Sequence, residues 1–272
     1  ALRALLPEEI KVEYITRIGT DSISLEMLEF FKGSGLVTSH VQFDELRTVG
    51  VYTISVDRSG ERSFSYWRGQ SAARKLASDF LILEAAMKDC DLIYLSGITA
   101  SIIDQAGRKN ILSCLRSAKN KGTLIAYDPN YRYNLWSSLA VMKKFTSEVV
   151  PLADIILPTF DDELKAFGDV ETKDTFKRLS ELGCSEIVLK NGIQKTEAMS
   201  SETMIEIDVD SVKVPKDTTG AGDSFNGAYL SARVIGEDIS SSVKKAQAVS
   251  SYVVMERGAL VEHEALLNAF NT

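Results

Sequence analysis

Short apolar runs alternate with helical patterns through the middle of this 272-residue chain. The apolar runs lie at 92–98, 123–128, 154–157 and 186–190. Continuous apolar runs of this length are typical of parallel strands, which are buried on both faces. In the intervening segments apolar residues recur at helical spacing, at 101–122, 143–152, 161–167 and 172–182. Repeated strand–helix–strand units predict an α/β fold, with a mostly parallel sheet flanked by helices on both faces.

Two other segments have the pattern of β-hairpins. In the first, Val49–Gly69 (VGVYTISVDRSGERSFSYWRG), two strand-like runs flank the turn sequence DRSGE. It carries Tyr52, Tyr66 and Arg68, which are unusual side chains for a simple edge ribbon. The second is Lys195–Val209. No Pro-, Gly- or Ser-rich linker is found, so we expect one α/β domain over residues 1–272, with a small β-hairpin lid at about 49–69.

Charge and composition restrict the possible partners. The net charge is −7, so the chain has no general attraction for nucleic acid or for an anionic membrane. No apolar run reaches the roughly 20 residues of a membrane helix. Cys90, Cys114 and Cys184 form no CxxC pair, and His40 and His263 lie in no metal or hydrolase motif. We therefore expect a cytoplasmic protein that binds neither nucleic acid nor membrane.

The sequence DTTGAGDSFNGAYL, at 217–230, contains three glycines before and within an apolar helical pattern. The third glycine is misplaced for a dinucleotide fingerprint, and no lysine stands where a P-loop needs one. An anion site at a helix start remains. We expect a helix over Ser224–Ile235, preceded by unpaired backbone amides of Gly220, Ala221, Gly222 and Asp223.

Asp223 is the informative residue of this stretch, because a carboxylate beside a bound anion is repelled by it. Its presence is explained if it accepts a proton from an attacking hydroxyl. It is equally explained if Asp223 caps the helix. The residues alone leave both interpretations open.

The same stretch resembles the C-terminal signature of the ribokinase-like (PfkB) carbohydrate kinases at every position of that pattern. The resemblance implies a ribokinase-like fold and phosphoryl transfer from ATP with Mg²⁺. It also implies that Asp223 is the catalytic base and that the backbone of Gly220, Ala221 and Gly222 forms the anion hole, where Gly220 and Gly222 also contact ATP.

Three longer segments are similar to one branch of this family, the kinases of 2-keto-3-deoxygluconate. They are GVYTISVDRSGERSFSYWRGQSAARKL, LIYLSGI and YDPNYRYNLW. The resemblance implies that Tyr66, Arg68 and Arg132 hold the keto acid, with Tyr52 beside them on the lid and Asp223 at the reacting hydroxyl. Arginine suits a sugar acid because its planar guanidinium can pair with a carboxylate in a bidentate way.

The nucleotide side of the site is marked by fewer residues. By the same resemblance, Lys190 and Gly192 in VLKNG lie along the nucleotide, and Asn130 and Arg132 reach the phosphates. The family has an NxxE element near its magnesium-bound water. The corresponding stretch here is TFDD, which leaves Asp162 as an outer-shell carboxylate for Mg²⁺.

Two segments depart from the family pattern. The glycine–aspartate or glycine–glutamate strand and the glycine–glycine–asparagine element that grips the sugar do not precede VEYITRIGTDSISLEML. We expect that this N-terminal strand and sugar-binding element are missing from the chain. The segment VKVPKDTTGAGD is also shorter than in the family, which predicts that residues are missing there as well.

The expected function is ATP-dependent phosphorylation of a sugar acid, 2-keto-3-deoxygluconate, at its primary hydroxyl to give the 6-phosphate. A fructokinase or ribokinase acting on a neutral sugar is the first alternative. A catalytically silent sugar-binding or regulatory protein is the second. By analogy with the family, the lid is where a homo-oligomer would form.

Overall fold

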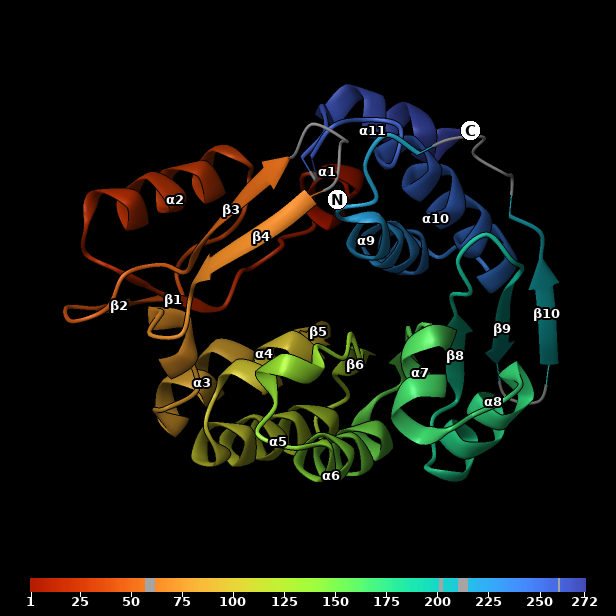
Figure 1. Ribbon diagram of the computed structural model, residues 1–272, viewed down its shortest axis with the longest axis horizontal. Helices are drawn as coiled ribbons and strands as arrows, with labels where there is room; N and C mark the ends of the chain where they lie inside the picture. Colours follow the sequence, from red (N-terminus) through yellow and green to blue (C-terminus); the bar gives the residue numbers. More distant parts are fainter. Residues whose placement is uncertain (57–61, 201–202, 210–214, 259) are drawn as a thin grey trace.

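The computed structural model describes residues 1–56, 62–200, 203–209, 215–258 and 260–272. Its centre is a six-stranded sheet in the order β10-β9-β8-β7-β6-β5 (Figure 1). Strands β5 to β8 are parallel, and β9 and β10 are antiparallel to their neighbours. The expected mostly parallel sheet is confirmed. In chain order the strands are β5 (Leu92–Ser96), β6 (Leu124–Asp128), β7 (Ile155–Ile156), β8 (Glu186–Leu189), β9 (Thr196–Ser200) and β10 (Thr203–Ile207).

Helices cover both faces of this sheet, as the sequence predicts, because successive strand residues point to opposite sides. Ile125 and Tyr127 of β6 are buried in a core with α3, α5, α6 and α8, whereas Ala126 between them packs with α9, α10 and α11. Figure 1 shows α9 and α10 above the sheet and α5 and α6 below it. In the described part of the chain, the helices that contribute to these two cores are α1 (Leu2–Leu5), α3 (Phe80–Met87), α4 (Gly97–Ile102), α5 (Gln105–Lys119), α6 (Leu139–Val149), α7 (Phe160–Phe167), α8 (Thr172–Glu181), α9 (Ala221–Val234), α10 (Ile239–Val253) and α11 (His263–Asn271).

Capping side chains set helix boundaries that periodicity alone missed. The single helix expected over 101–122 is wrong, because the chain breaks into α4 (Gly97–Ile102) and α5. Asp104 stands at the break, and its Oδ1 accepts the Gly107 N–H of α5 at 2.8 Å. Similarly, α6 begins before 143 because Ser138 Oγ accepts the Val141 N–H at 3.2 Å. Helix α7 (Phe160–Phe167) and helix α8 lie where the sequence places them.

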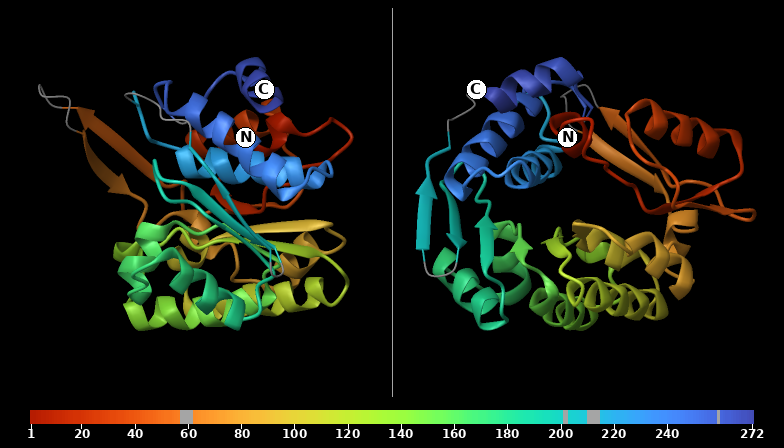
Figure 2. Two further views of the ribbon diagram at one scale, coloured as in Figure 1. Left: turned by 90° about the vertical axis from the view of Figure 1, so that its right-hand side faces the viewer. Right: turned by 180° about the vertical axis from the view of Figure 1, so that it is seen from behind.

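Both predicted hairpins are present, with different roles in the fold. β3 (Val51–Val56) and β4 (Arg62–Trp67) pair antiparallel as a separate two-stranded ribbon, in which Tyr52 lies opposite Tyr66. Figure 2 shows this lid ribbon projecting from the rest of the molecule. Its turn, 57–61, lies outside the described residues. The second hairpin is β9–β10, and it extends the main sheet through antiparallel pairing of β9 with β8.

A small parallel pair near the N-terminal end of the chain does not show in the sequence pattern. β1 (Thr16–Gly19) pairs with β2 (Val41–Asp44), and α2 (Ser22–Gly33) connects them. Each strand has only four residues, too few for a period to stand out. Missing residues are also expected within VKVPKDTTGAGD (212–223), between its proline and the aspartate; of this segment, residues 212–214 lie outside the described residues. Within the described part of the chain, no helix has the length and apolar content needed to cross a membrane.

Candidate active site

The glycine-rich stretch forms the start of α9, three residues earlier than the sequence predicts. Gly220 is the N-cap and has φ of 79°, in the left-handed region that glycine adopts without strain. Helix α9 therefore begins at Ala221, and the Ser224 N–H donates to Gly220 O at 2.8 Å. The expected start at Ser224 is wrong because side-chain periodicity does not reveal this backbone turn.

The turn leaves three of the four expected amides for an anion. The Ala221 N–H donates to Thr218 O at 3.3 Å. No hydrogen bond between described residues takes up the amides of Gly220, Gly222 or Asp223. The positive end of the α9 dipole lies at the same place, so the turn suits a phosphate group.

Gly222 leaves room above these amides. It is exposed, and a Cβ atom added there would meet no heavy atom within 4 Å. Its φ is not in the left-handed region, so the fold of the chain does not require glycine at this position. The small residue keeps the helix start open to an approaching anion.

Asp217 holds the segment that leads into this turn. Its Oδ1 accepts the Thr219 N–H at 2.9 Å and its Oδ2 accepts the Gly258 N–H at 2.9 Å. The carboxylate is buried, and the Asp217 N–H donates to Val254 O at 3.1 Å. Sequence reasoning gave Asp217 no role, although a carboxylate two residues before a backbone turn is a known signal for such a bond.

Asp223 lies in the first turn of α9, as its third residue, and is exposed to solvent. Gly220 is the N-cap, and no side-chain capping bond is formed at this end of the helix. The interpretation of Asp223 as the cap of α9 is therefore wrong. A carboxylate that is free of capping bonds and open to solvent can accept a proton from a bound hydroxyl.

A closed ring of polar contacts lies beside Asp223, at the carboxyl ends of the strands. Lys190 Nζ donates to Asn226 Oδ1 at 2.7 Å, and Asn226 Nδ2 donates to the Tyr94 hydroxyl at 3.2 Å. The Tyr94 hydroxyl donates to Asp128 Oδ2 at 3.3 Å, and Asp128 Oδ1 lies 3.7 Å from Lys190 Nζ. Sequence reasoning named only Lys190 among these four, and as a nucleotide contact. A second member, Asp128, could have been found from the sequence, because it is a carboxylate at the carboxyl end of an apolar strand.

The electrostatics of this ring involve three carboxylates and one buried ammonium. Burial raises the pKa of Asp128, and the Asp223 charge raises it further, while the Lys190 ammonium lowers it. Burial lowers the pKa of Lys190, and the negative charges of Asp128, Asp223 and Asp162 raise it. The Lys190 ammonium is thus the counter-charge that these carboxylates share.

The predicted phosphate contacts lie on the loop that follows β6. Asn130 has φ of 37°, and Arg132 is exposed; its charge lowers the pKa of Asp128 and of Asp162. Gly97 makes room for this loop, because a Cβ there would come 1.9 Å from Pro129 O. Gly192 is exposed, with φ of 58°, in the turn after Lys190.

Asp162, the expected magnesium contact, lies at the start of α7 and is half-buried. Burial raises its pKa, and Arg132 and Lys165 lower it. In the described part of the chain, no three His, Cys, Asp or Glu side chains are close enough together to hold a metal ion. Mg²⁺ keeps several waters and is usually bound through one or two carboxylates and phosphate oxygens, so a single carboxylate such as Asp162 is compatible with the predicted outer-shell role.

The next residue, Glu163, belongs to a buried ionic cluster. Arg178 NH2 donates to Glu163 Oε2 at 2.8 Å and also pairs with Asp169. Glu163 is 0% exposed, and its Oε1 has no hydrogen-bond partner among the described residues. Burial raises the pKa of Glu163 from about 4.5 to about 7, although Arg178 opposes the shift.

This cluster predicts a pH-dependent stability. The pKa of Glu163 is higher in the folded than in the unfolded chain, so its protonated form favours folding. This contribution to the free energy of unfolding is fully present below about pH 4.5 and is lost as the pH rises through about 7. Between pH 5 and pH 8 we expect the Tm of the wild type to fall by roughly 2–4 °C more than that of Glu163→Gln, which cannot titrate. Parallel Tm curves for the two proteins in thermal unfolding would contradict this.

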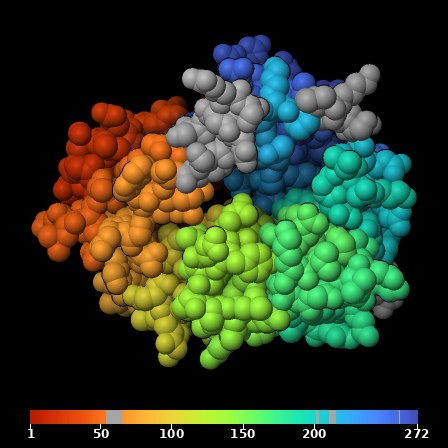
Figure 3. Space-filling view, viewed as in Figure 1, coloured from red at the N-terminus to blue at the C-terminus, as the bar shows by residue number. Residues whose placement is uncertain are grey.

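The lid residues form a second group. The rings of Tyr52 and Tyr66 lie 6.1 Å apart, and the Arg68 guanidinium carbon lies 4.2 Å from the centroid of the Tyr66 ring. Tyr52 and Tyr66 are about half exposed. The structure thus brings Tyr52, Tyr66 and Arg68 together, while Arg132 belongs to the sheet-end group. In the space-filling view the surface is recessed between the lid strands, α9 and α7 (Figure 3).

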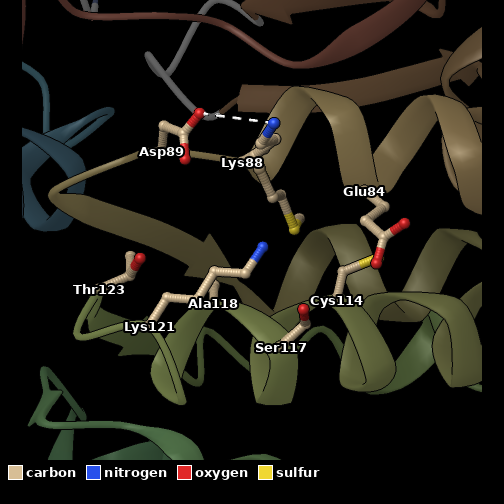
Figure 4. Close-up of a pocket in the computed structure, with 9 residues that line it drawn as sticks. Glu84, Lys88, Asp89, Cys114, Ser117, Ala118, Lys121 and Thr123 are labelled. Carbon is tan, nitrogen blue, oxygen red and sulfur yellow. Dashed lines mark ion pairs between the residues drawn. The ribbon is translucent and has the colours of Figure 1, made fainter.

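Two cavities lie away from this site, toward the amino ends of the strands. One of about 10 Å³ between α3 and α5 has room for a single water and is lined by Lys88, Cys114 and Ser117 (Figure 4). The other, of about 350 Å³, lies between β10 and the start of α10. It borders Arg233, whose guanidinium is already bound to Glu186 and to Glu237 O.

Comparisons with known proteins find a family and solved structures that this chain resembles. A model of the "pfkB family carbohydrate kinase" matches residues 1–265. The 2-dehydro-3-deoxygluconokinase of Haemophilus influenzae is 34% identical over 265 residues, which cover 95% of this chain and 84% of that protein. The 2-dehydro-3-deoxygluconokinase of Escherichia coli K12 is 35% identical over 272 residues, covering 97% and 87%. The crystal structure of E. coli ribokinase II with ATP and Mg²⁺ superposes with a TM-score of 0.85 at 21% identity, covering 99% of this chain and 85% of that one.

Proposed function

The chain belongs to the pfkB family of carbohydrate kinases, and we propose that it transfers the γ-phosphoryl group of MgATP to the primary hydroxyl of 2-keto-3-deoxygluconate. The first turn of α9 is the observation that carries this proposal. There, the exposed Asp223 carboxylate lies in the same turn as the amides of Gly220 and Gly222, which no described residue takes up. A carboxylate and an anion site in one helix turn are what a base and a phosphoryl-binding hole require.

The proposed roles of the chain follow from these positions. Bound MgATP supplies the phosphoryl group and neutralises part of its charge. Asp223 accepts the proton of the attacking hydroxyl, and the amides of Gly220, Gly222 and Asp223 stabilise negative charge on the moving group. Ala221 contributes its small size, since its N–H is bonded to Thr218 O.

The other proposed contacts position the reactants. Asn130 and Arg132, on the loop after β6, contact the phosphates. Gly192 lies along the nucleotide, and Asp162 reaches the magnesium ion through a water molecule. In this proposal the side chains position and neutralise the reactants and form no covalent intermediate. That suits phosphoryl transfer, in which positioning and electrostatics matter more than covalent chemistry.

A keto acid is favoured over a neutral sugar by two observations. The two relatives at 34% and 35% identity are 2-dehydro-3-deoxygluconokinases, and that substrate is 2-keto-3-deoxygluconate under another name. The lid also carries Arg68 beside Tyr66 and Tyr52, so a guanidinium and two aromatic rings lie together. The guanidinium can pair with the carboxylate, and the rings can lie against the carbon chain.

A coupled assay of ADP release tests the function directly. The chain is supplied with MgATP and, in turn, with 2-keto-3-deoxygluconate, fructose or ribose. The proposal requires the highest kcat/KM with the keto acid. Preference for fructose or ribose would assign a neutral-sugar kinase. Absence of turnover with all three, together with binding of one of them, would assign a silent sugar-binding protein.

The substrate assignment predicts the effect of Arg68→Leu. A charge-assisted hydrogen bond is worth about 1.5–3 kcal/mol, so the KM for the keto acid should rise by roughly 10- to 150-fold. The KM for ATP should change little, because Arg68 lies in the lid group, over the ring of Tyr66. Initial rates at varied keto acid and varied ATP measure both constants.

Two further variants sharpen this test. Arg68→Lys should recover only part of the loss, because lysine keeps the charge without the planar fork. Arg74→Leu removes a nearby arginine of the 3-10 turn Ala72–Lys75 and should leave all constants within about twofold. An Arg68→Leu protein with the KM of the wild type would make Arg68 a surface charge and leave Arg132 as the candidate for the carboxylate.

A further inference from the structure

Helix α9 is joined to the strand β8 by polar contacts at two places. Near Asp223, Asn226 Oδ1 accepts from Lys190 Nζ at 2.7 Å, just beyond the last residue of β8. At the other end of that strand, the Tyr229 hydroxyl donates to Glu186 Oε1 at 2.7 Å. Arg233 also pairs with Glu186 there, at 2.8 Å. Only the first of these contacts adjoins the proposed site.

The first contact belongs to the closed ring of Lys190, Asn226, Tyr94 and Asp128, which joins the middle of β5 and the carboxyl ends of β6 and β8 to α9. Asn226 is 1% exposed and Asp128 is 4% exposed. Asn226 accepts from Lys190 and donates to Tyr94, so both ends of its amide are used. A reversed amide would turn its N–H donors toward the Lys190 ammonium, which is also only a donor. The ring therefore holds Asn226 in one orientation.

Asn226 follows Asp223 by three residues on α9, so the two side chains lie on one face of the helix, one turn apart. The Lys190 ammonium that binds Asn226 also lies in the field of the Asp223 carboxylate. Movement of the ring would thus move the first turn of α9 relative to the sheet. Asn130 and Arg132 follow Asp128 directly, so the same ring fixes both halves of the proposed site.

We propose that Asn226 and Lys190 are positioning residues for the reaction, which fix the Asp223 carboxylate and the α9 amides against the sheet end. This inference rests on the proposed function. It assigns the Lys190 ammonium to the ring and not to the nucleotide, because Asn226 and Asp128 already surround it. Misplacement of reacting groups by about 1 Å can cost on the order of 100-fold in rate, so the effect belongs in kcat.

The test compares variants of the ring with a matched variant of the second contact. Lys190→Met and Asn226→Leu should each lower kcat by about 100-fold, with the KM for ATP and for the sugar within about threefold of the wild type. Lys190→Arg should recover part of the loss. Tyr229→Phe removes a buried hydrogen bond from the same helix to the same strand and should keep kcat within about twofold, even where it lowers the Tm.

The double variant Lys190→Met/Asn226→Leu adds a second readout. Since the two residues act through one contact, its kcat should be close to that of either single variant. A double variant whose losses multiply would contradict a shared positioning role. The shared positioning role would also be contradicted if the ring variants and Tyr229→Phe lose the same Tm and their kcat values fall by the same factor.

Tyr94→Phe keeps the test decisive if the larger changes prevent folding, because it removes one hydroxyl from the same ring. Its kcat should fall by roughly 3- to 10-fold at unchanged KM, and a kcat equal to that of the wild type would overturn the inference. Asp223→Asn separates this inference from the proposed function. If Asp223→Asn turns over as the wild type does, the proposed function fails; if it is inactive while Lys190→Met is fully active, only the positioning role fails.

Discussion

Asp223→Asn is expected to lower kcat by about 10²–10⁴-fold while MgATP binding changes little. The amide keeps the shape of the carboxylate but cannot accept a proton at neutral pH. The fold should not suffer, because Asp223 is exposed and forms no capping bond at the start of α9. Steady-state rates give kcat, and titration calorimetry with a non-hydrolysable MgATP analogue gives the affinity.

A helix-cap aspartate provides the matched control for this variant. Asp238 is the N-cap of α10 and accepts the Ser241 N–H at 2.9 Å. Asp238→Ala should lower the Tm, because the capping bond is lost, and leave kcat unchanged. If Asp223→Asn instead keeps its kcat within threefold of the wild type, Asp223 is not the base and the proposed reaction loses its central residue.

Gly222→Val is the second large effect, and we expect kcat/KM for the kinase reaction to fall by at least about 10²–10³-fold. The structure shows why this variant should stay folded: a Cβ at position 222 meets no heavy atom within 4 Å, and the backbone there is not in the left-handed region. The added side chain occupies the open space over the amides where the phosphoryl group must approach. Circular dichroism checks the fold, and steady-state kinetics measure the loss.

Gly33→Val is the matched control, because Gly33 ends helix α2 with the same open surroundings and lies far along the chain from α9. It should retain the kcat/KM of the wild type. Gly222→Ala should give an intermediate loss, in proportion to the smaller side chain. A folded Gly222→Val protein with the activity of the wild type would place the phosphoryl cradle elsewhere.

Much of the fold could be predicted because it depends on local patterns. The buried strands at 92–96, 124–128 and 186–189 read as apolar runs, and both hairpins read as paired strand-like segments around turns. The wrong boundaries have one cause. A single capping bond sets the break at Asp104, and another sets the early start of α6. One backbone angle sets the turn at Gly220. The spacing of hydrophobic residues in the sequence reveals none of these.

The candidate site likewise contains residues that local sequence patterns predict and residues that they do not. The stretch at 217–230 identifies Asp223 and the glycines beside it as candidates, because the helix start, the amides and the proposed base all lie within a few residues of one another. The lid cluster of Tyr52, Tyr66 and Arg68 could also be predicted, since hairpin pairing brings neighbouring positions together.

The sequence by itself therefore determined the strand segments of the sheet, the lid ribbon and the residues of the α9 turn, since each depends on side chains close together in the chain. Only the tertiary structure decided that Tyr94 and Asn226, 132 residues apart, share a hydrogen bond beside Asp223. The contacts of the Lys190 ammonium with Asn226 and Asp128 likewise became visible only in the tertiary structure. These contacts depend on the order and register of β5, β6 and β8 and on where α9 packs across them. Polar groups buried together must find partners there, whatever their separation in the sequence.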